Sequence, residues 1–136
     1  MILLDTNVIS ESMRVGPDPR VIGWLDRHPA SNLFLCAITV DEIAFGIEVL
    51  PSGRKRSRLA AAFSRIIDVF SERIIAFDTR AATESAKFRG RRHLAGAPMS
   101  LGDSQIAGVA KSRGYALATL NVRDFRDIDL TVLEPR

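Results

Sequence analysis

Short apolar runs alternate along the chain with segments in which apolar residues repeat at helical spacing. Runs that are short and almost wholly apolar are typical of strands in a parallel sheet that helices cover on both faces. The alternation therefore predicts an α/β fold with three layers, α/β/α, around a central, mostly parallel sheet of four to five strands. The predicted strands are residues 1–4, 33–37, 74–77 and 115–120, with a candidate fifth at 130–133.

Capping residues mark where several helical segments begin and end. Thr39 with Glu42, and Ser100 with Asp103, have the spacing of a capping box, and Gly114 is a typical helix end. The predicted helices are residues 6–13, 19–28, 39–50, 54–71, 79–88 and 100–114. Residues 89–99, which contain arginine, glycine and proline, are predicted to form a loop.

Size and composition fit one globular domain over residues 1–136. A chain of 136 residues with 46% hydrophobic residues can bury a core without a disulfide or a structural metal. Cys36 is the only cysteine and lies in an apolar run, so it is interpreted as a small buried hydrophobe. No stretch approaches the ~20 apolar residues that span a bilayer. We therefore expect a cytoplasmic protein without membrane contact.

Arginine dominates the positive charge of the chain. Lysine and arginine number 19 against 16 acidic residues, and 16 of the 19 are arginine. They cluster at residues 54–58 and 89–93. A guanidinium group matches two phosphate oxygens at once, which favours a nucleic acid as partner, whereas a solvated helix face explains such clusters equally well. From charge alone, both interpretations stay open.

Three carboxylates lie where a predicted strand ends or a helix begins. Asp5 follows the first strand, Glu42 lies in the first turn of the helix after the second, and Asp103 opens the helix before the fourth. Capping and the helix dipole explain Glu42 or Asp103 taken alone. However, Asp103 shares a helical stripe with apolar residues 106, 107 and 110, and Glu42 with residues 45, 46 and 49. This spacing predicts that both side chains lean inward.

Carboxylates at one edge of a sheet repel one another and are costly to bury unless a cation neutralises them. A set of oxygen ligands without a cluster of His and Cys suits Mg²⁺ or Mn²⁺ better than zinc. The segment 118–125 ends a strand at the same edge, so Asn121 or Asp124 is a candidate fourth ligand. A turn at Asn121 and a helix cap at Asp124 explain these two residues equally well.

Four segments, taken in order, resemble the motifs of one known family. They are residues 3–11, 37–42, 101–107 and 118–125. Together they resemble the PIN-domain ribonucleases, and specifically the toxins of VapC/FitB-like toxin–antitoxin pairs. No single motif is specific, but four motifs in this order and at these separations are. The resemblance covers essentially the whole chain and implies the PIN-like form of the three-layer fold.

The resemblance implies a divalent-metal site built from acids. Asp5, Glu42 and Asp103 match metal-binding positions of the family, so they are expected to bind Mg²⁺ or Mn²⁺. Asn121 stands where some members carry an acid, and Asp124 matches the downstream Asp that accompanies such an asparagine in other members. The implied catalytic set is therefore the three acids together with Asp124.

The resemblance also implies supporting residues and a reaction. Thr6 and Thr119 match hydroxyl positions that orient the carboxylates or a metal-bound water, and helix capping explains Thr6 equally well. The implied reaction is endonucleolytic hydrolysis of RNA that leaves a 5′-phosphate and a 3′-hydroxyl. Arginines of the two clusters would hold the RNA backbone beside the acids. The candidates are Arg54, Arg56, Arg91 and Arg92.

The family further implies a homodimer that a small antitoxin neutralises. The DNA-binding part of the antitoxin represses the shared operon, so this chain would meet DNA only through its partner. The C-terminal segment of the antitoxin lies in a groove of the toxin and can place a basic side chain among the acids. Phe45, Leu59 and Phe63 are candidate groove walls, although core packing is the better interpretation for most of them.

Other functions that place acids at a sheet edge fit the sequence less well. Phosphatases that form an aspartyl-phosphate carry a second acid two residues after the nucleophile, where this chain has Asn7. Receiver domains need an acidic pair after the first strand and a lysine after the last, and neither occurs. A catalytically silent PIN-like module that binds RNA or protein stays open because of Asn121. Dependence of RNA cleavage on divalent metal distinguishes that module from the nuclease.

Overall fold

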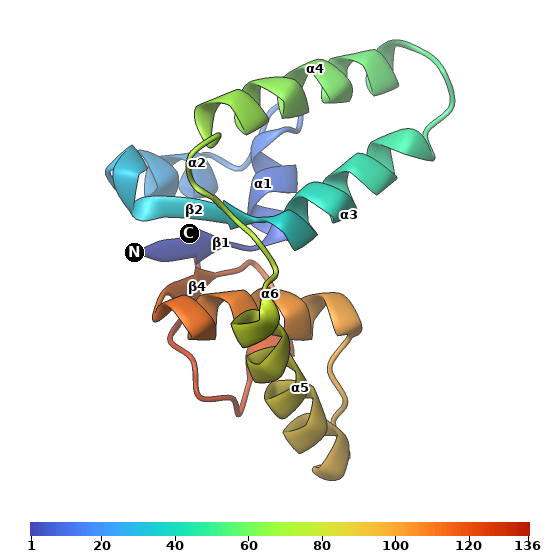
Figure 1. The fold of residues 1–136 in the computed structure, drawn as a ribbon. Coiled ribbons are helices and arrows are strands. Elements are labelled where there is room, and N and C mark those ends of the chain that lie inside the picture. Colours follow the sequence, from blue (N-terminus) through green and yellow to red (C-terminus); the bar gives the residue numbers. More distant parts are fainter.

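The computed structural model describes all 136 residues, and its five strands form one wholly parallel sheet in the order β3-β2-β1-β4-β5 (Figure 1). In the central strand, Leu3 pairs with Phe34 on one side and with Leu117 on the other. The predicted α/β fold is therefore confirmed. The strands are β1 (Ile2–Leu4), β2 (Leu33–Cys36), β3 (Ile74–Ile75), β4 (Ala116–Ala118) and β5 (Val132–Leu133).

Helices cover both faces of the sheet. Successive residues of a strand point to opposite faces, so Ile2 and Leu4 join one half of the core and Leu3 joins the other. In Figure 1 the first four helices lie on one side of the strands and the last two on the other. The helices are α1 (Thr6–Ser12), α2 (Pro19–Asp26), α3 (Ala37–Glu48), α4 (Arg54–Val69), α5 (Thr79–Leu94) and α6 (Leu101–Arg113).

Helix α5 is longer than the sequence predicts. It runs to Leu94, so the predicted loop over residues 89–99 is wrong for its first half. The second arginine cluster therefore lies on the last turns of α5, where cations interact favourably with the C-terminal end of the helix dipole. The chain leaves the helix at Gly96, whose φ of 75° is accessible to glycine at little cost.

Helix α3 begins at Ala37, two residues before the predicted cap at Thr39. No side chain caps it, and Thr39 is buried inside the first turn, so the capping box predicted there is wrong. The predicted inward stripe is also wrong, because Phe45 is 66% exposed and Glu42 lies on the same outward side. By contrast, the capping box of α6 is confirmed in part, since the Asp103 N–H donates to Ser100 Oγ at 3.1 Å.

Helix α4 packs against α3 without a single fully buried residue. Leu59 and Phe63 are half-buried against the core beneath it, which confirms core packing for these two candidate groove walls. Cys36 is fully buried, as predicted. No helix combines the length and the apolar character needed to cross a membrane.

Candidate active site

Asp5 is fixed where β1 passes into α1. Its backbone N–H donates to Ala118 O of the neighbouring β4 at 2.9 Å, which continues the strand pairing by one residue. Its carboxylate caps α1 by accepting the Thr6 N–H at 2.8 Å, and it accepts the Thr119 hydroxyl at 2.8 Å. The residue is only 4% exposed. The carboxylate is therefore held in one orientation at the carboxyl edge of the sheet.

Burial raises the pKa of Asp5 to about 6. The bonds from Thr119 and Thr6 oppose this rise, and the negative charges of Asp103 and Glu42 add to it. A carboxyl group with a pKa this high is partly protonated near neutral pH. A cation at this position would offset both the burial and the repulsion, and would favour the ionised form.

Glu42 reaches the same edge from α3. The Thr6 hydroxyl donates to Glu42 Oε1 at 2.7 Å, and the same hydroxyl oxygen lies 3.2 Å from Thr39 Oγ1. On its other side, Glu42 Oε2 lies 2.9 Å from the point where a Cβ on Gly102 would stand. The carboxylate of Glu42 therefore fits against the first turn of α6 because residue 102 has no side chain.

Asp103 stands half-buried in the first turn of α6. Burial raises its pKa, a hydrogen bond with Ser100 opposes the rise, and the charges of Asp124 and Glu42 add to it. The positive charge of Arg92 lowers the pKa. Asp103 thus lies within electrostatic reach of two other candidate acids and of one arginine.

The segment after β4 carries the two candidates for a fourth ligand. Asp124 is exposed on the short 3₁₀ helix Val122–Phe125, and its charge acts on Asp103. Asn121 is also exposed, and its backbone N–H donates to Thr119 Oγ1 at 3.0 Å. Asn121 therefore forms the turn that leads to Asp124.

Asn7 is a supporting residue to which the sequence assigned no role. Its Nδ2 donates to Thr119 Oγ1 at 3.2 Å, and its Oδ1 accepts the Leu120 N–H at 3.0 Å. Asn7 thereby connects α1 to the end of β4 and holds the hydroxyl that donates to Asp5. Asn7 and Thr119 lie 112 residues apart in sequence, so no local pattern could have revealed the contact between them.

The four candidate RNA-binding arginines differ in what they contact. Arg56 forms an exposed ion pair with Glu48 at 3.1 Å, whereas the side chains of Arg54 and Arg91 are exposed and make no hydrogen bond within the chain. Arg92 is half-buried, and its guanidinium donates to three backbone carbonyl groups. The guanidinium group of Arg92 is therefore engaged by hydrogen bonds within the chain.

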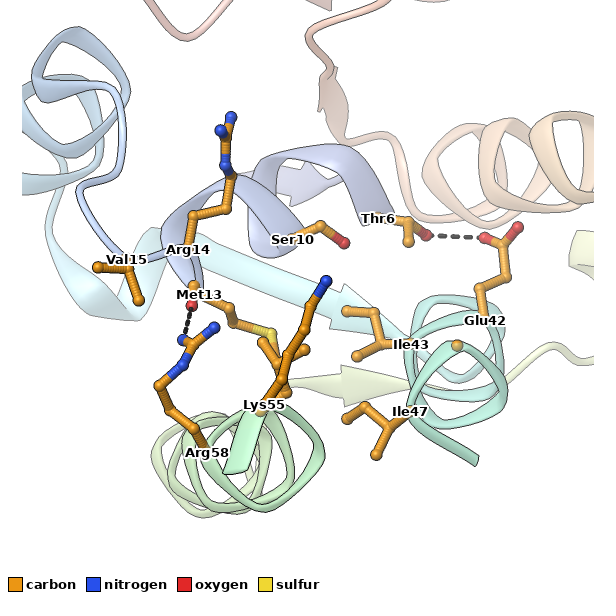
Figure 2. Close-up of a pocket in the computed structure, with 12 residues that line it drawn as sticks. Thr6, Ser10, Met13, Arg14, Val15, Glu42, Ile43, Ile47, Lys55 and Arg58 are labelled. Atoms are coloured by element: carbon orange, nitrogen blue, oxygen red, sulfur yellow. Dashed lines mark hydrogen bonds between the residues drawn. The ribbon is translucent and has the colours of Figure 1, made fainter. Parts of the chain in front are cut away.

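A cleft of about 420 Å³ opens beside the acids between α1, α3 and α4 (Figure 2). Figure 2 shows the bonded pair Thr6 and Glu42 at one end and Arg14 with Arg58 at the other. The side chains between them are mostly apolar, and Leu59 is the only candidate groove wall among them. The cleft therefore has an acidic end and a basic end. The remaining lining includes Met13, Ile43, Ile47 and Lys55.

The chemistry of the four acids fits a hard divalent cation. All their donors are carboxylate oxygens, and their charges raise the pKa of Asp5 and Asp103. As the side chains lie, no three His, Cys, Asp or Glu groups are close enough together to hold an ion. Glu42 and Asp124 are exposed, so they are the members of the set with room to reorient.

Comparison with known proteins agrees with the fold. A model of the PIN domain matches residues 2–130, so the chain belongs to the PIN-domain family. Toxin FitB of Neisseria gonorrhoeae is 37% identical over 136 residues, covering 99% of this chain and 98% of FitB. VapC ribonuclease Y4jK of Sinorhizobium fredii is 32% identical over 136 residues, covering 99% of this chain and 97% of that protein.

Chains in solved complexes also resemble this structure. A chain in the structure of FitAB bound to an IR36 DNA fragment has a TM-score of 0.91 and 37% identity, covering 99% of this chain and 95% of that one. A chain of DNA-bound VapBC from Salmonella typhimurium has a TM-score of 0.85 and 25% identity, covering 99% of this chain and 98% of that one. The PIN-like architecture expected from the four motifs is thus confirmed.

Proposed function

We propose that this chain is a divalent-metal-dependent endoribonuclease and the toxin of a toxin–antitoxin pair. The observation that carries the proposal is the buried carboxylate of Asp5, whose pKa the charges of Asp103 and Glu42 raise further. Such an arrangement is costly unless a cation binds there. The relatives named toxin FitB and VapC ribonuclease support the activity and the toxin role.

In this proposal, Asp5, Glu42, Asp103 and Asp124 hold Mg²⁺ or Mn²⁺. When bound, such an ion supplies an activated water and offsets negative charge on the phosphate as the phosphodiester bond breaks. The chain itself orients the acids. Thr119 donates to Asp5, and Thr6, Thr39 and Asn121 form the hydrogen-bonded surroundings of the site. The supporting residues expected from the sequence are Thr6, Thr119 and Asn121, and Asn7 joins them through its bond to Thr119.

RNA needs cations beside this acidic edge, because carboxylates repel its backbone. Among the candidates, Arg54 and Arg91 have exposed side chains that are open to such contact, whereas Arg56 is half-buried and would have to leave its ion pair with Glu48. Contacts with the backbone carry no sequence information, so they would position any RNA strand and leave the choice of target to the shape of the surface.

The second part of the proposal concerns the antitoxin. An antitoxin segment would lie in the cleft of Figure 2 and place a basic side chain at the end formed by Thr6 and Glu42, where it would compete with metal. The solved relatives are complexes that include DNA, which supports contact with DNA through the antitoxin. The toxin is proposed to act as a homodimer, as the resemblance implies. Saturating antitoxin should then weaken Mn²⁺ binding, and unchanged Mn²⁺ affinity would contradict the competition.

The decisive experiment incubates the antitoxin-free protein with single-stranded and structured RNA in Mg²⁺, Mn²⁺ or EDTA. The control is the double variant Asp5→Asn, Asp103→Asn, purified in the same way. Cleavage that requires metal and disappears in the double variant supports the nuclease. Undiminished cleavage by the double variant identifies a contaminant. Metal binding without any cleavage would overturn the activity and favour the silent RNA-binding module.

A further inference from the structure

Arg92 connects two loops that lie far apart in sequence. Its Nε donates to Ala97 O at 2.6 Å, and its Nη1 donates to Asp124 O and to Arg126 O, each at 3.1 Å. Its own carbonyl oxygen accepts the Ala97 N–H at 3.0 Å, so Arg92 and Ala97 exchange two hydrogen bonds. The guanidinium therefore joins the end of α5 to the segment that follows β4.

Each of the two loops presents one of the candidate acids. Residues 95–100 lead from α5 into the first turn of α6, which carries Asp103. The 3₁₀ helix Val122–Phe125 carries Asp124. Within this second loop, the Asp124 N–H donates to Asn121 O at 2.9 Å and Phe125 is buried, but the carbonyl groups of Asp124 and Arg126 point to Arg92.

The two elements that carry these acids pack against each other. Helix α6, which carries Asp103, contacts the 3₁₀ helix Val122–Phe125, which carries Asp124. The donors of Arg92 are engaged by backbone oxygens of this second element and of the residue that follows it. In this, Arg92 differs from the exposed Arg91 next to it, whose side chain makes no hydrogen bond within the chain.

We propose that Arg92 is a positioning residue of the active site, which sets Asp124 beside Asp103 by fixing the backbone of both loops. The proposal rests on the nuclease function argued above. It reassigns Arg92 from RNA contact to support of the acids. An arginine suits this task because its planar fork reaches several acceptors at fixed angles, which the single ammonium group of a lysine cannot do.

The test compares two substitutions that keep the positive charge, Arg92→Lys and the control Arg80→Lys. Arg80 is exposed on the same helix α5, and its side chain makes no hydrogen bond within the chain. Loss of outer-shell support of a metal site typically costs about 10–100-fold in metal affinity or activity. We expect Arg92→Lys to lower kcat by about 10-fold or more and to raise the Mg²⁺ concentration for half-maximal activity. KM for RNA should change little, and Arg80→Lys should resemble the wild type.

The competing role of Arg92, direct contact with RNA, gives the opposite pattern. A charged contact with the backbone survives replacement by lysine in large part, so Arg92→Lys would keep its kcat, whereas Arg92→Gln would raise KM. That outcome would overturn the proposal. Far-UV circular dichroism and thermal melts of each variant establish that it is folded, and Arg92→Gln replaces Arg92→Lys if the latter does not fold.

Two readouts do not depend on RNA cleavage. Amide hydrogen exchange should become faster in residues 95–100 and 121–127 of Arg92→Lys than in Arg80→Lys, and calorimetric titration should show weaker Mn²⁺ binding. If the wild type binds Mn²⁺ without cleaving RNA, the nuclease function fails while these readouts still decide the role of Arg92. Exchange and Mn²⁺ binding equal to those of the wild type would refute it.

Discussion

The Thr6 hydroxyl donates a hydrogen bond of 2.7 Å to Glu42 Oε1 across 36 residues of sequence. Glu42 is exposed, so this bond and the space above Gly102 are what orient its carboxylate toward the other acids. Helix α3 thereby contributes Glu42 to a site whose other members follow β1 and β4 or lie in the first turn of α6.

Replacing Thr6 with valine keeps the shape of the side chain and removes the donor. We expect Thr6→Val to lower kcat by about 10-fold, because Glu42 is then free to swing into solvent, and Thr6→Ser to restore most of the activity. Steady-state RNA cleavage at saturating Mg²⁺ measures the effect. Equal activity of the valine and serine variants would show that the bond is not used in catalysis.

The substitution Asn7→Ala removes the amide that donates to Thr119 and the amide oxygen that accepts the Leu120 N–H. A half-buried N–H left without a partner costs about 1–3 kcal/mol, so the free energy of unfolding should fall by that amount. Urea denaturation measures it. Ser10→Ala is the matched control, because Ser10 is exposed in the same helix and should leave stability within about 0.5 kcal/mol of the wild type.

The pKa of Asp5 is raised from its ordinary value of 3.8 to about 6 in the folded chain, which makes stability depend on pH. The folded state binds more protons than the unfolded state between these values, so this stabilising contribution is present below pH 3.8 and is lost as pH rises through about 6. In the metal-free protein, Asp5→Asn should remove a decrease of at most about 3 kcal/mol between pH 4 and pH 7. If the free energy of unfolding changed with pH in the same way for both proteins, this prediction would be wrong.

Mg²⁺ should stabilise the protein more at higher pH. Ligating carboxylates must be ionised, so protons compete with the ion at Asp5. Saturating Mg²⁺ is therefore expected to raise the Tm by several degrees at pH 7.5 and by less at pH 5.5, because an ion that binds only the folded state stabilises it. The double variant Asp5→Asn, Asp103→Asn should show no rise at either pH.

Two glycines of α6 separate effects on the site from effects on folding. Gly102→Ala places a Cβ 2.9 Å from Glu42 Oε2, the end of a flexible side chain, so activity should fall while stability stays near that of the wild type. Gly108→Ala places a Cβ 2.7 Å from Ser85 N in α5 and against Ala81 O. Such overpacking costs about 1–3 kcal/mol. Cleavage assays should therefore show lower activity for Gly102→Ala, and thermal melts should show lower stability for Gly108→Ala.

Local patterns predicted most of the fold and less of the site. The strands and the Ser100 cap depend on residues that are neighbours in sequence, so local patterns predict them. The arginines and Gly90 at the end of α5 are common in loops, so the sequence predicts too short a helix, although these residues are compatible with a helix. The spacing of Glu42 and Phe45 predicts a shared buried face, whereas the structure exposes both.

The supporting contacts of Asn7 and Arg92 could not be predicted, because they join residues that are distant in sequence. Asn7 meets Thr119 only because β1 and β4 are neighbours in the sheet. Arg92 meets Asp124 only because α5 and the loop after β4 lie on the same side. Residue type indicated the chemistry of the site, and the order of the strands determined which residues support it.

The position of β1 in the sheet also bears on when the protein becomes active during its synthesis. β1 is the first strand to be made, yet its partner β4 consists of residues 116–118, and Asp124 follows later still. Asp5 cannot receive its bond from Thr119 until that part of the chain has emerged from the ribosome. A growing chain is therefore expected to be harmless to the RNA around it until residues 116–124 have emerged from the ribosome.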